Sequence, residues 1–285
     1  WNFPLAMLAW KLGPALASGN SVVVKPPELT TLTTLRFAEL ATEAGLPDGV
    51  LNVVPGLGHV TGEALGLHGD VDAISFTGSN EVGREFLRYS AESNLKRIVL
   101  ELGGKAPQIV TADNADRLEL VAEDLAGAAF GNMGQNCTAG SRILVDASLP
   151  DDCDPLDPGT TIGALVEESA LHRVARYVDE AVADGATVRT GGEQVLQDTG
   201  GWFYPPTVVT GVREDTDIAR EEIFGPVVVV LPFTDLEDAI RIANDTPSGL
   251  AATVWSRDIA DALTAARPVR AGTVAVNGYS EGDIT

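Results

Sequence analysis

Residues 73–101 read AISFTGSNEVGREFLRYSAESNLKRIVLE, and this stretch contains a complete strand–helix–strand unit. Residues 73–77 (AISFT) and 97–101 (RIVLE) are short apolar runs of the kind that form buried strands. Residues 80–90 between them predict a helix, and Ser79 is placed to cap it. Repeated strand–helix units of this length predict a parallel sheet with right-handed crossovers.

The same order continues on both sides of this unit. Towards the N-terminus we expect strands at residues 21–25 (SVVVK) and 50–54 (VLNVV), a helix that begins at Thr30 or Thr31 and ends before Gly45, and a helix near 59–67. Towards the C-terminus we expect helices at residues 115–130, 167–184, 236–243 and 259–266, and strands at 142–146, 227–232, 251–255 and 273–276. The sequence therefore predicts an α/β fold.

A change of role is expected at the glycine pair Gly103–Gly104, which permits a hinge-like crossing of the chain. We therefore predict two domains, residues 1–103 and residues 104–285. Internal repeats and low-complexity tracts are absent from the sequence.

Composition excludes several classes of protein. The chain has 285 residues, 45% of them hydrophobic, which is enough for a sizeable core. Its net charge of −22 disfavours a nucleic-acid partner, because phosphates repel such a surface. No apolar run is long enough to span a bilayer, and two cysteines in a chain of this length do not form a disulfide scaffold. We expect a cytoplasmic protein without a membrane partner, although Trp1 in place of Met predicts that the true N-terminus lies further upstream.

Residues 130–141 (FGNMGQNCTAGS) place one cysteine, Cys137, in a glycine-rich turn after a helix. Small neighbours leave the thiol accessible, and a thiolate with a nearby base is a nucleophile. The alternative is a buried core cysteine. Residues 99–105 (VLELGGK) place Glu101 inside an apolar strand, where an acidic side chain is costly unless it has a partner or a catalytic purpose. It is a candidate general base, and the alternative is a salt bridge to Lys105 or Arg97.

Two further segments suit a dinucleotide. Residues 77–83 (TGSNEVG) join a strand to a helix, where backbone N–H groups and the helix dipole favour a phosphate, although an ordinary helix cap at Ser79 is the alternative. Residues 24–28 (VKPPE) follow a parallel strand, where Lys25 and Glu28 can reach a ribose, although a solvated ion pair is the alternative. The G-x-G-x-x-G fingerprint of dinucleotide-binding folds is absent from the sequence.

Taken together and in this order, the segments resemble the aldehyde dehydrogenase superfamily. The segments are WNFP (1–4), KPPE (25–28), FTGS (76–79), ELGGK (101–105), GQNC (134–137), EEIFGP (221–226) and VN (276–277). The resemblance implies a Rossmann-type parallel-sheet cofactor domain and an α/β catalytic domain, both incomplete. We expect further strands and an oligomerisation hairpin before Trp1, and a further strand after Thr285.

The resemblance also implies a mechanism. Cys137 attacks the aldehyde and forms a thiohemiacetal, whose oxyanion is held by the Asn2 side chain and the Cys137 backbone N–H. Hydride transfer leaves a thioester, and Glu101 activates the water that hydrolyses it. The cleft between the two domains is expected to place Cys137 and Glu101 on opposite sides of one pocket.

The cofactor site follows from the same resemblance. The residues expected to hold NAD are Trp1, Lys25, Glu28, Gly78, Ser79, Val82, Gly103, Glu222 and Phe224. Lys25 and Glu28 would meet the adenosine ribose, and Glu222 would hold the nicotinamide ribose. Because a carboxylate at Glu28 repels a 2′-phosphate, we expect NAD rather than NADP.

Within the superfamily, residues 10–21, 154–163 and 276–285 are similar to the aminoaldehyde enzymes of putrescine breakdown, which act on γ-glutamyl-γ-aminobutyraldehyde and related ω-amino aldehydes. Glu281 and Asp283 either attract a cationic substrate amine or form a solvated acidic loop. Residues 146–154 (DASLPDDCD) are shorter than in the family, and Cys153 within them is expected to be a surface cysteine without a catalytic role. The resemblance further implies a homodimer or homotetramer.

Two other functions remain open from the sequence. A CoA-acylating semialdehyde dehydrogenase passes the acyl group to CoA, and Glu101 favours water instead. A catalytically inactive fragment of the same fold is the other alternative.

Overall fold

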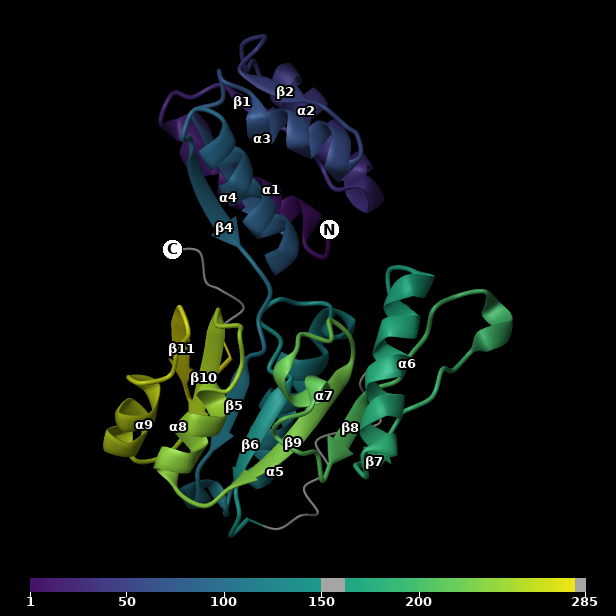
Figure 1. The fold of residues 1–285 in the computed structure, drawn as a ribbon, viewed down its shortest axis with the longest axis vertical. Coiled ribbons are helices and arrows are strands. Elements are labelled where there is room, and N and C mark those ends of the chain that lie inside the picture. Colours follow the sequence, from purple (N-terminus) through teal and green to yellow (C-terminus); the bar gives the residue numbers. More distant parts are fainter. Residues whose placement is uncertain (150–161, 280–285) are drawn as a thin grey trace. The chain divides into compact units, whose positions relative to one another are not determined.

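A computed structural model describes residues 1–149 and 162–279 of the chain. The chain divides into two compact units, Trp1–Leu102 and the residues from Gly103 onward, and each is described by itself (Figure 1). Cys153, Glu281 and Asp283 lie outside the described residues, so the expectations for them stay predictions. In the part of the chain that the structure describes, no helix is long and apolar enough to cross a membrane.

The first unit consists of helices that alternate with short strands. Its elements are α1 (Pro4–Ala17), β1 (Val22–Val24), α2 (Thr31–Glu43), β2 (Leu51–Val53), α3 (Glu63–Leu67), β3 (Ala73–Thr77), α4 (Asn80–Glu92) and β4 (Arg97–Glu101). A π-helical turn (Gly58–Gly62) precedes α3.

The predicted parallel pairing is confirmed in this unit, but the strands do not join into one sheet. Among the described residues, β1 pairs only with β2 and β3 only with β4, both in parallel. Each pair is connected through a helix, as parallel neighbours require. The register joins Ala73 to Arg97 and Thr77 to Glu101, so the two strands end at the same level.

Helix α1 is not among the helices predicted from the sequence. Pro4 begins the helix, where a missing backbone N–H has no cost. Leu8 and Leu12, one turn apart, are buried on the same face.

The second unit is built around a seven-stranded sheet within the described residues, in the order β11-β10-β5-β6-β9-β8-β7. Its strands are β5 (Pro107–Val110), β6 (Arg142–Asp146), β7 (Thr187–Thr190), β8 (Thr207–Thr210), β9 (Val227–Phe233), β10 (Ala251–Trp255) and β11 (Thr273–Val276). Its helices are α5 (Leu118–Phe130), α6 (Glu168–Ala183), α7 (Asp217–Arg220), α8 (Leu236–Asn244) and α9 (Ile259–Ala266). All neighbours pair in parallel except β7, which runs antiparallel to β8 at the edge.

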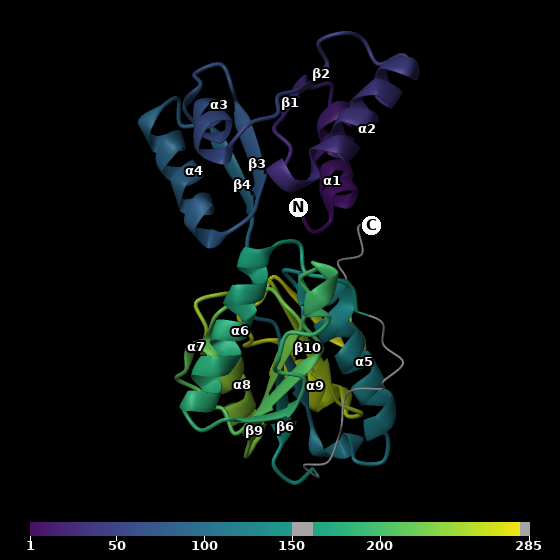
Figure 2. The same cartoon turned by 90° about the vertical axis from the view of Figure 1, so that its right-hand side faces the viewer.

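Helices cover both faces of this sheet, which is why its strand β9 (VVVVLPF) is apolar throughout. Val227, Val229 and Leu231 of β9 belong to the larger apolar cluster, which includes side chains of α6–α9. On the other face, Val228 belongs to the smaller cluster, which includes side chains of α5, and Val230 packs against that cluster. This alternation follows from the two-residue period of a strand. Figure 2 shows α5 on one side of the sheet and α6 and α8 on the other.

The sequence reading missed the strands β5, β7 and β8 and the short helix α7. Strand β5 is fully buried, although it begins with a proline and contains Gln108. Gln108 Nε2 donates to Gly140 O at 2.9 Å and to Leu125 O at 3.3 Å, which satisfies the amide NH2 group, whereas Gln108 Oε1 has no hydrogen-bond partner among the described residues. Helix α5 begins at Leu118 rather than at residue 115, because a separate 3-10 turn occupies Ala112–Asn114.

Candidate active site

In the first unit, three of the predicted residues lie where β3 passes into α4. The backbone N–H of Gly78 donates to Glu101 O at 3.1 Å, which ties the end of β3 to the end of β4. Ser79 is the N-cap of α4, and its Oγ accepts from the backbone N–H of Val82 at 3.3 Å. A Cβ at Gly78 would lie 2.4 Å from the Phe76 ring, so this turn requires glycine. The alternative reading of Ser79 as a helix cap is confirmed, and a phosphate role at this helix end stays a prediction.

Lys25 and Glu28 form an ion pair after β1. The Lys25 ammonium lies 3.0 Å from Glu28 Oε1, which also accepts from the Gly58 backbone N–H at 2.6 Å. Partial burial acts to raise the pKa of Glu28, but hydrogen bonds from its own backbone, from Lys25 and from Gly58 outweigh it and lower the pKa. The contacts with Lys25 and Gly58 both use Oε1. The carboxylate is therefore charged, fixed in position and still able to accept a hydrogen bond from a hydroxyl group.

Glu101 ends β4 and is half-buried, so the expectation of a strand-buried carboxylate overstated its burial. A salt bridge to Arg97 is not formed among the described residues of this unit. The nearby cation is Lys11, whose Nζ donates to Ser75 Oγ at 3.1 Å. Burial lowers the pKa of Lys11, and the negative charge of Glu101 opposes this shift. Trp1 and Asn2 are half-buried just before α1.

In the second unit, the turn Gly103–Gly104 brings two predicted segments together. The backbone N–H of Gly104 donates to Glu222 Oε1 at 3.2 Å. A Cβ at Gly103 would lie 2.2 Å from Glu222 Oε2, and a Cβ at Gly104 would lie 2.4 Å from the carbonyl oxygen of Cys137. Only residues without a Cβ permit both approaches. The turn thus holds the carboxylate of the EEIFGP segment and the backbone of the cysteine segment side by side.

The cysteine turn has a strained backbone. Asn132, Met133 and Gly134 have consecutive positive φ values of 51°, 58° and 64°, which residues other than glycine rarely adopt. A Cβ at Gly134 would lie 2.1 Å from Gly225 O, so this turn also packs directly on the EEIFGP segment. Cys137 is half-buried at its end. Strain of this kind is characteristic of functional sites.

Tyr279 is a site residue that the sequence reading missed. Its hydroxyl accepts from Asn136 Nδ2 at 2.9 Å and lies 2.9 Å from Thr138 Oγ1. Asn136 Oδ1 in turn accepts from the Thr138 backbone N–H at 3.1 Å. Both neighbours of Cys137 are therefore fixed by one hydrogen-bonded group. The only sequence signal was an aromatic residue two positions after the VN motif.

Helix α6 holds the EEIFGP segment from the other side. Tyr177 Oη donates to Glu221 Oε2 at 2.6 Å, and Arg173 Nε donates to Ile223 O at 3.1 Å. Burial, and then the hydrogen bond to Glu221, raise the pKa of Tyr177 to about 12, so this hydroxyl remains a donor. Phe224 has a φ of 55°, which this anchoring maintains. Arg173 and Tyr177 lie one turn apart on α6. Neither was predicted as a site residue, and the available sequence signal was a polar side chain on the inner face of an amphipathic helix.

Glu222 is less readily ionised than an exposed carboxyl group. Burial raises its pKa, while the Gly104 N–H and the charges of Lys105 and Arg173 lower it again, with a net rise. Its carboxylate therefore depends on neighbouring donors and cations for its charge.

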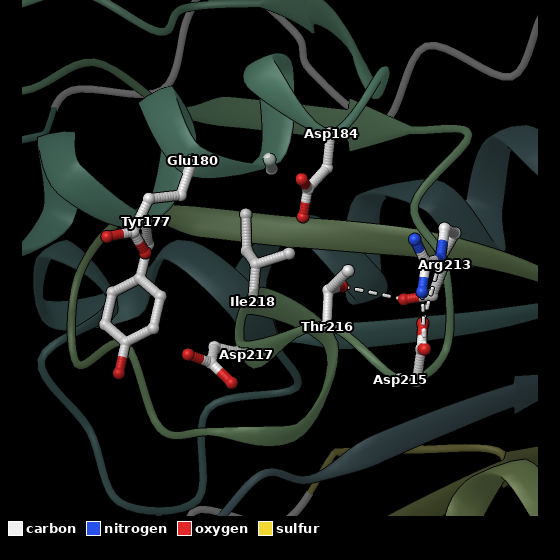
Figure 3. Close-up of a pocket in the computed structure, with 9 residues that line it drawn as sticks. Tyr177, Glu180, Asp184, Arg213, Asp215, Thr216, Asp217 and Ile218 are labelled. Carbon is white, nitrogen blue, oxygen red and sulfur yellow. Dashed lines mark hydrogen bonds and ion pairs between the residues drawn. The ribbon is translucent and has the colours of Figure 1, made fainter.

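A surface hollow in the second unit does not belong to this site (Figure 3). It is lined by Tyr177, Glu180, Ala181, Asp184, Arg213, Asp215, Thr216, Asp217 and Ile218, and none of the predicted site residues is among them. Arg213 pairs there with Asp215 at 2.5 Å. The hollow is acidic, since Glu180, Asp184, Asp215 and Asp217 line it with Arg213 as its one cation among the described residues.

The structure therefore assembles the predicted residues within each unit. The second unit brings together Gly103, Cys137, Glu222 and the backbone of the segment that carries Phe224. The first unit groups Gly78, Ser79, Val82 and Glu101, and separately pairs Lys25 with Glu28. A pocket shared by Glu101 and Cys137 joins the two units and stays a prediction.

Comparison with known proteins gives a consistent answer. The model of the aldehyde dehydrogenase family matches residues 1–285. The chain is 50% identical to an aminoacetaldehyde dehydrogenase of Pseudomonas aeruginosa, over 99% of this chain and 59% of that protein. It is 45% identical to the NADP/NAD-dependent aldehyde dehydrogenase PuuC of Escherichia coli, over 100% of this chain and 59% of that protein. The chain thus spans about 59% of the length of these relatives.

Solved structures agree with the fold. An indole-3-acetaldehyde dehydrogenase in complex with NAD+ is 50% identical and matches with a TM-score of 0.94, over 99% of this chain and 60% of that one. A γ-glutamyl-γ-aminobutyraldehyde dehydrogenase of Burkholderia cenocepacia is 51% identical, with a TM-score of 0.92 over 99% of this chain and 59% of that one. The resemblance and the α/β fold inferred from the motifs are confirmed, and the chain belongs to the aldehyde dehydrogenase family.

Proposed function

We propose that this protein oxidises an aldehyde to a carboxylic acid with NAD as the hydride acceptor. The observation that carries the proposal is the Gly103–Gly104 turn, against which the Glu222 carboxylate and the Cys137 backbone both pack. A nucleophile and a ribose-binding carboxylate on one rigid turn are what a cysteine-dependent dehydrogenase needs. The residues from Gly103 onward then form the catalytic domain, and Trp1–Leu102 the cofactor domain.

Cys137 is the nucleophile. Its thiolate sulfur forms a bond to the aldehyde carbon, and the carbonyl π electrons move to the oxygen. The Asn2 amide and the Cys137 backbone N–H donate to this oxyanion, and such a preorganised donor lowers the barrier by about 3 kcal/mol. The strained turn before Cys137 keeps the nucleophile in one orientation.

Glu101 completes the reaction. A bound dinucleotide would supply the hydride acceptor for the aldehyde carbon, and Cys137 would then carry an acyl group. Glu101 takes a proton from a water molecule, whose oxygen attacks the acyl carbon and releases the acid and the thiolate. The overall change consumes aldehyde, NAD and water and produces acid, NADH and a proton.

The residues present fit a dinucleotide. Lys25 and Glu28 suit the adenosine ribose, and the N-terminal turn of α4 with Gly78, Ser79 and Val82 suits the pyrophosphate. Gly103 and Glu222 suit the nicotinamide ribose, with Trp1 and Phe224 beside the cofactor. The charged state of Glu28 supports NAD over NADP, because a 2′-phosphate would meet a fixed negative charge.

The substrate class is an aliphatic or ω-amino aldehyde such as γ-glutamyl-γ-aminobutyraldehyde. Relatives named for aminoacetaldehyde and for γ-glutamyl-γ-aminobutyraldehyde support it, although a relative named for indole-3-acetaldehyde is equally similar. A survey of kcat/KM over ω-amino, aliphatic and aromatic aldehydes, with product analysis in the presence and absence of CoA, tests both the substrate and the use of water. Putrescine catabolism, a cytoplasmic location and a homodimer or homotetramer accompany this proposal.

The roles of Cys137 and Glu101 predict different failures. Cys137→Ala should give neither NADH nor acid, because no thiohemiacetal forms. Glu101→Gln should release a burst of one NADH per active site and then turn over about 10²–10⁴-fold more slowly, since the base is lost after oxidation. Stopped-flow fluorescence of NADH measures both. Glu43→Gln on the exposed face of α2 is the control, and an unchanged steady-state rate in Glu101→Gln would contradict the assignment.

The coenzyme preference predicts the effect of Glu28→Gln. Removing the charge should raise kcat/KM for NADP relative to NAD by roughly tenfold, because the repulsion of the 2′-phosphate disappears. Coenzyme titrations with one aldehyde measure the ratio, and Glu39→Gln on α2 provides the matched control. Equal use of both coenzymes by the unsubstituted protein would refute the preference.

The close approach at Gly104 predicts a stability effect. Gly104→Ala should lower the free energy of unfolding by about 1–3 kcal/mol, because the new Cβ meets the Cys137 carbonyl at 2.4 Å. Alkylation of Cys137 by iodoacetamide should change in rate as well. Gly127→Ala in α5, where a Cβ meets nothing within 4 Å, should be neutral or stabilising. Urea unfolding measures the stability and mass spectrometry measures the alkylation. Equal stability of the Gly104→Ala and Gly127→Ala variants would contradict the close approach of Gly104 to the Cys137 carbonyl.

A further inference from the structure

Lys105, directly after the Gly103–Gly104 turn, has no role in the mechanism above and an unusual environment. Its side chain is fully buried, with 0% exposure, and its Nζ has no hydrogen-bond partner among the described residues. A buried ammonium without an acceptor is strongly disfavoured. Lysine is also scarce in this protein, at positions 11, 25, 96 and 105 only.

A second buried cation, Arg142, lies next to Lys105 and disfavours a positive charge on it. Arg142 of β6 is 1% exposed and donates to Lys105 O at 3.0 Å, to Ile242 O at 3.0 Å and to Ala243 O at 2.7 Å. Burial lowers the pKa of Arg142 to about 10, and Asp245 opposes the shift. Because its guanidinium has three acceptors and remains charged at neutral pH, Arg142 disfavours a second positive charge on Lys105.

Two carboxylates act in the opposite direction. Glu222, held by Gly104, and Glu221, held by Tyr177, both favour the protonated amine of Lys105. Burial first, and then Arg142, lower the pKa of Lys105 to about 7 against these two carboxylates. The Lys105 charge in turn lowers the pKa of Glu222. The amine and the Glu222 carboxyl group therefore influence each other within one buried cluster.

We propose that Lys105 is a positioning residue for Glu222, whose buried amine supplies the counter-charge of this carboxylate and so controls how firmly it holds a ribose. The inference rests on the proposed role of Glu222. A ribose at Glu222 would donate its hydroxyls to the ionised carboxylate, and the protonated amine of Lys105 favours that ionised state. Binding therefore takes up a proton at Lys105, and by linkage the dinucleotide binds more weakly as the pH rises through about 7.

The coupling is tested without any cofactor. Lysine labelled with ¹³C at Cε gives signals from only four residues, and Lys105→Met identifies the signal of Lys105. If that variant does not fold, Lys→Arg changes at positions 11, 25 and 96 identify it by elimination. We expect the Lys105 signal to titrate near pH 7.

Substitution of the two carboxylates then decides the proposal. Glu222→Gln should lower the pKa of Lys105 further, because it removes the carboxylate with the largest favourable effect, and Glu221→Gln should lower it less. Glu119→Gln, an exposed residue of α5, is the matched control and should leave it unchanged. A Lys105 signal that titrates at the same pH with and without the Glu222 carboxylate overturns the proposal.

Stability supplies a second test that needs no cofactor. Unfolded lysine has a pKa of 10.5, whereas Lys105 in the folded chain has a pKa of about 7. Between these values the unfolded chain binds a proton that the folded chain does not, so stability rises with pH across this window. Lys105→Met should remove this contribution to the pH dependence of the unfolding free energy, while Lys96→Met, at a lysine buried in the first unit, should not.

Binding of NADH, followed by its fluorescence from pH 6 to 9, tests the consequence for the cofactor. The Kd of the unsubstituted protein should rise as the pH passes about 7. In Lys105→Met this rise should disappear, and in Lys105→Arg, whose charge is permanent, the Kd should stay low at high pH.

The outcomes separate this inference from the proposed function. If NADH does not bind at any pH but Glu222→Gln still shifts Lys105, the dinucleotide function fails and the coupling of the pair stands. If NADH binds and Lys105→Met keeps the full pH dependence of the Kd, the role of Lys105 is overturned and the dinucleotide function stands.

Discussion

The close approach of three segments at Gly103–Gly104 is the constraint on which the site depends. The Glu222 carboxylate occupies the space of one missing Cβ, and the Cys137 carbonyl occupies the space of the other. A third missing Cβ, at Gly134, lets the cysteine turn pack on Gly225 of the same segment. Because the contacts at Gly104 and Gly134 are with backbone atoms, those two approaches have little freedom to relax, whereas the contact at Gly103 is with the end of the Glu222 side chain.

Electrostatics makes the same turn sensitive to charge. The second unit buries two neighbouring cations, Lys105 and Arg142, and the charge of Lys105 acts on Glu222. Arg142 is satisfied by three carbonyl oxygens, whereas the Lys105 amine has no acceptor in the part of the chain that the structure describes. Burial therefore distributes charge unequally, with one permanent cation and one that titrates. The Glu222 carboxylate and the Lys105 amine influence each other's charge.

Support from further away keeps this geometry in place. Helix α6 fixes the Glu222 segment through Arg173 and Tyr177, and Tyr279 fixes both neighbours of Cys137. Positive φ values at Met133 and Phe224 persist because this packing holds them. Acidic residues of the chain also lie away from this site, for example around the hollow beside α6.

The sequence by itself determined the α/β class, the strand–helix units of the first hundred residues and the family, because apolar periodicity and ordered motifs are local properties of the chain. It also placed Cys137, Glu101, Glu28 and Glu222 as candidates. Tertiary structure decided what local patterns do not contain: that β5 is central although it begins with Pro107, and that Glu101 is half-buried. It likewise decided that Tyr279 and Arg173 support the site and that Lys105 lacks an acceptor. Burial and hydrogen-bond partners arise only when segments far apart in the sequence pack together, so no local pattern reports them.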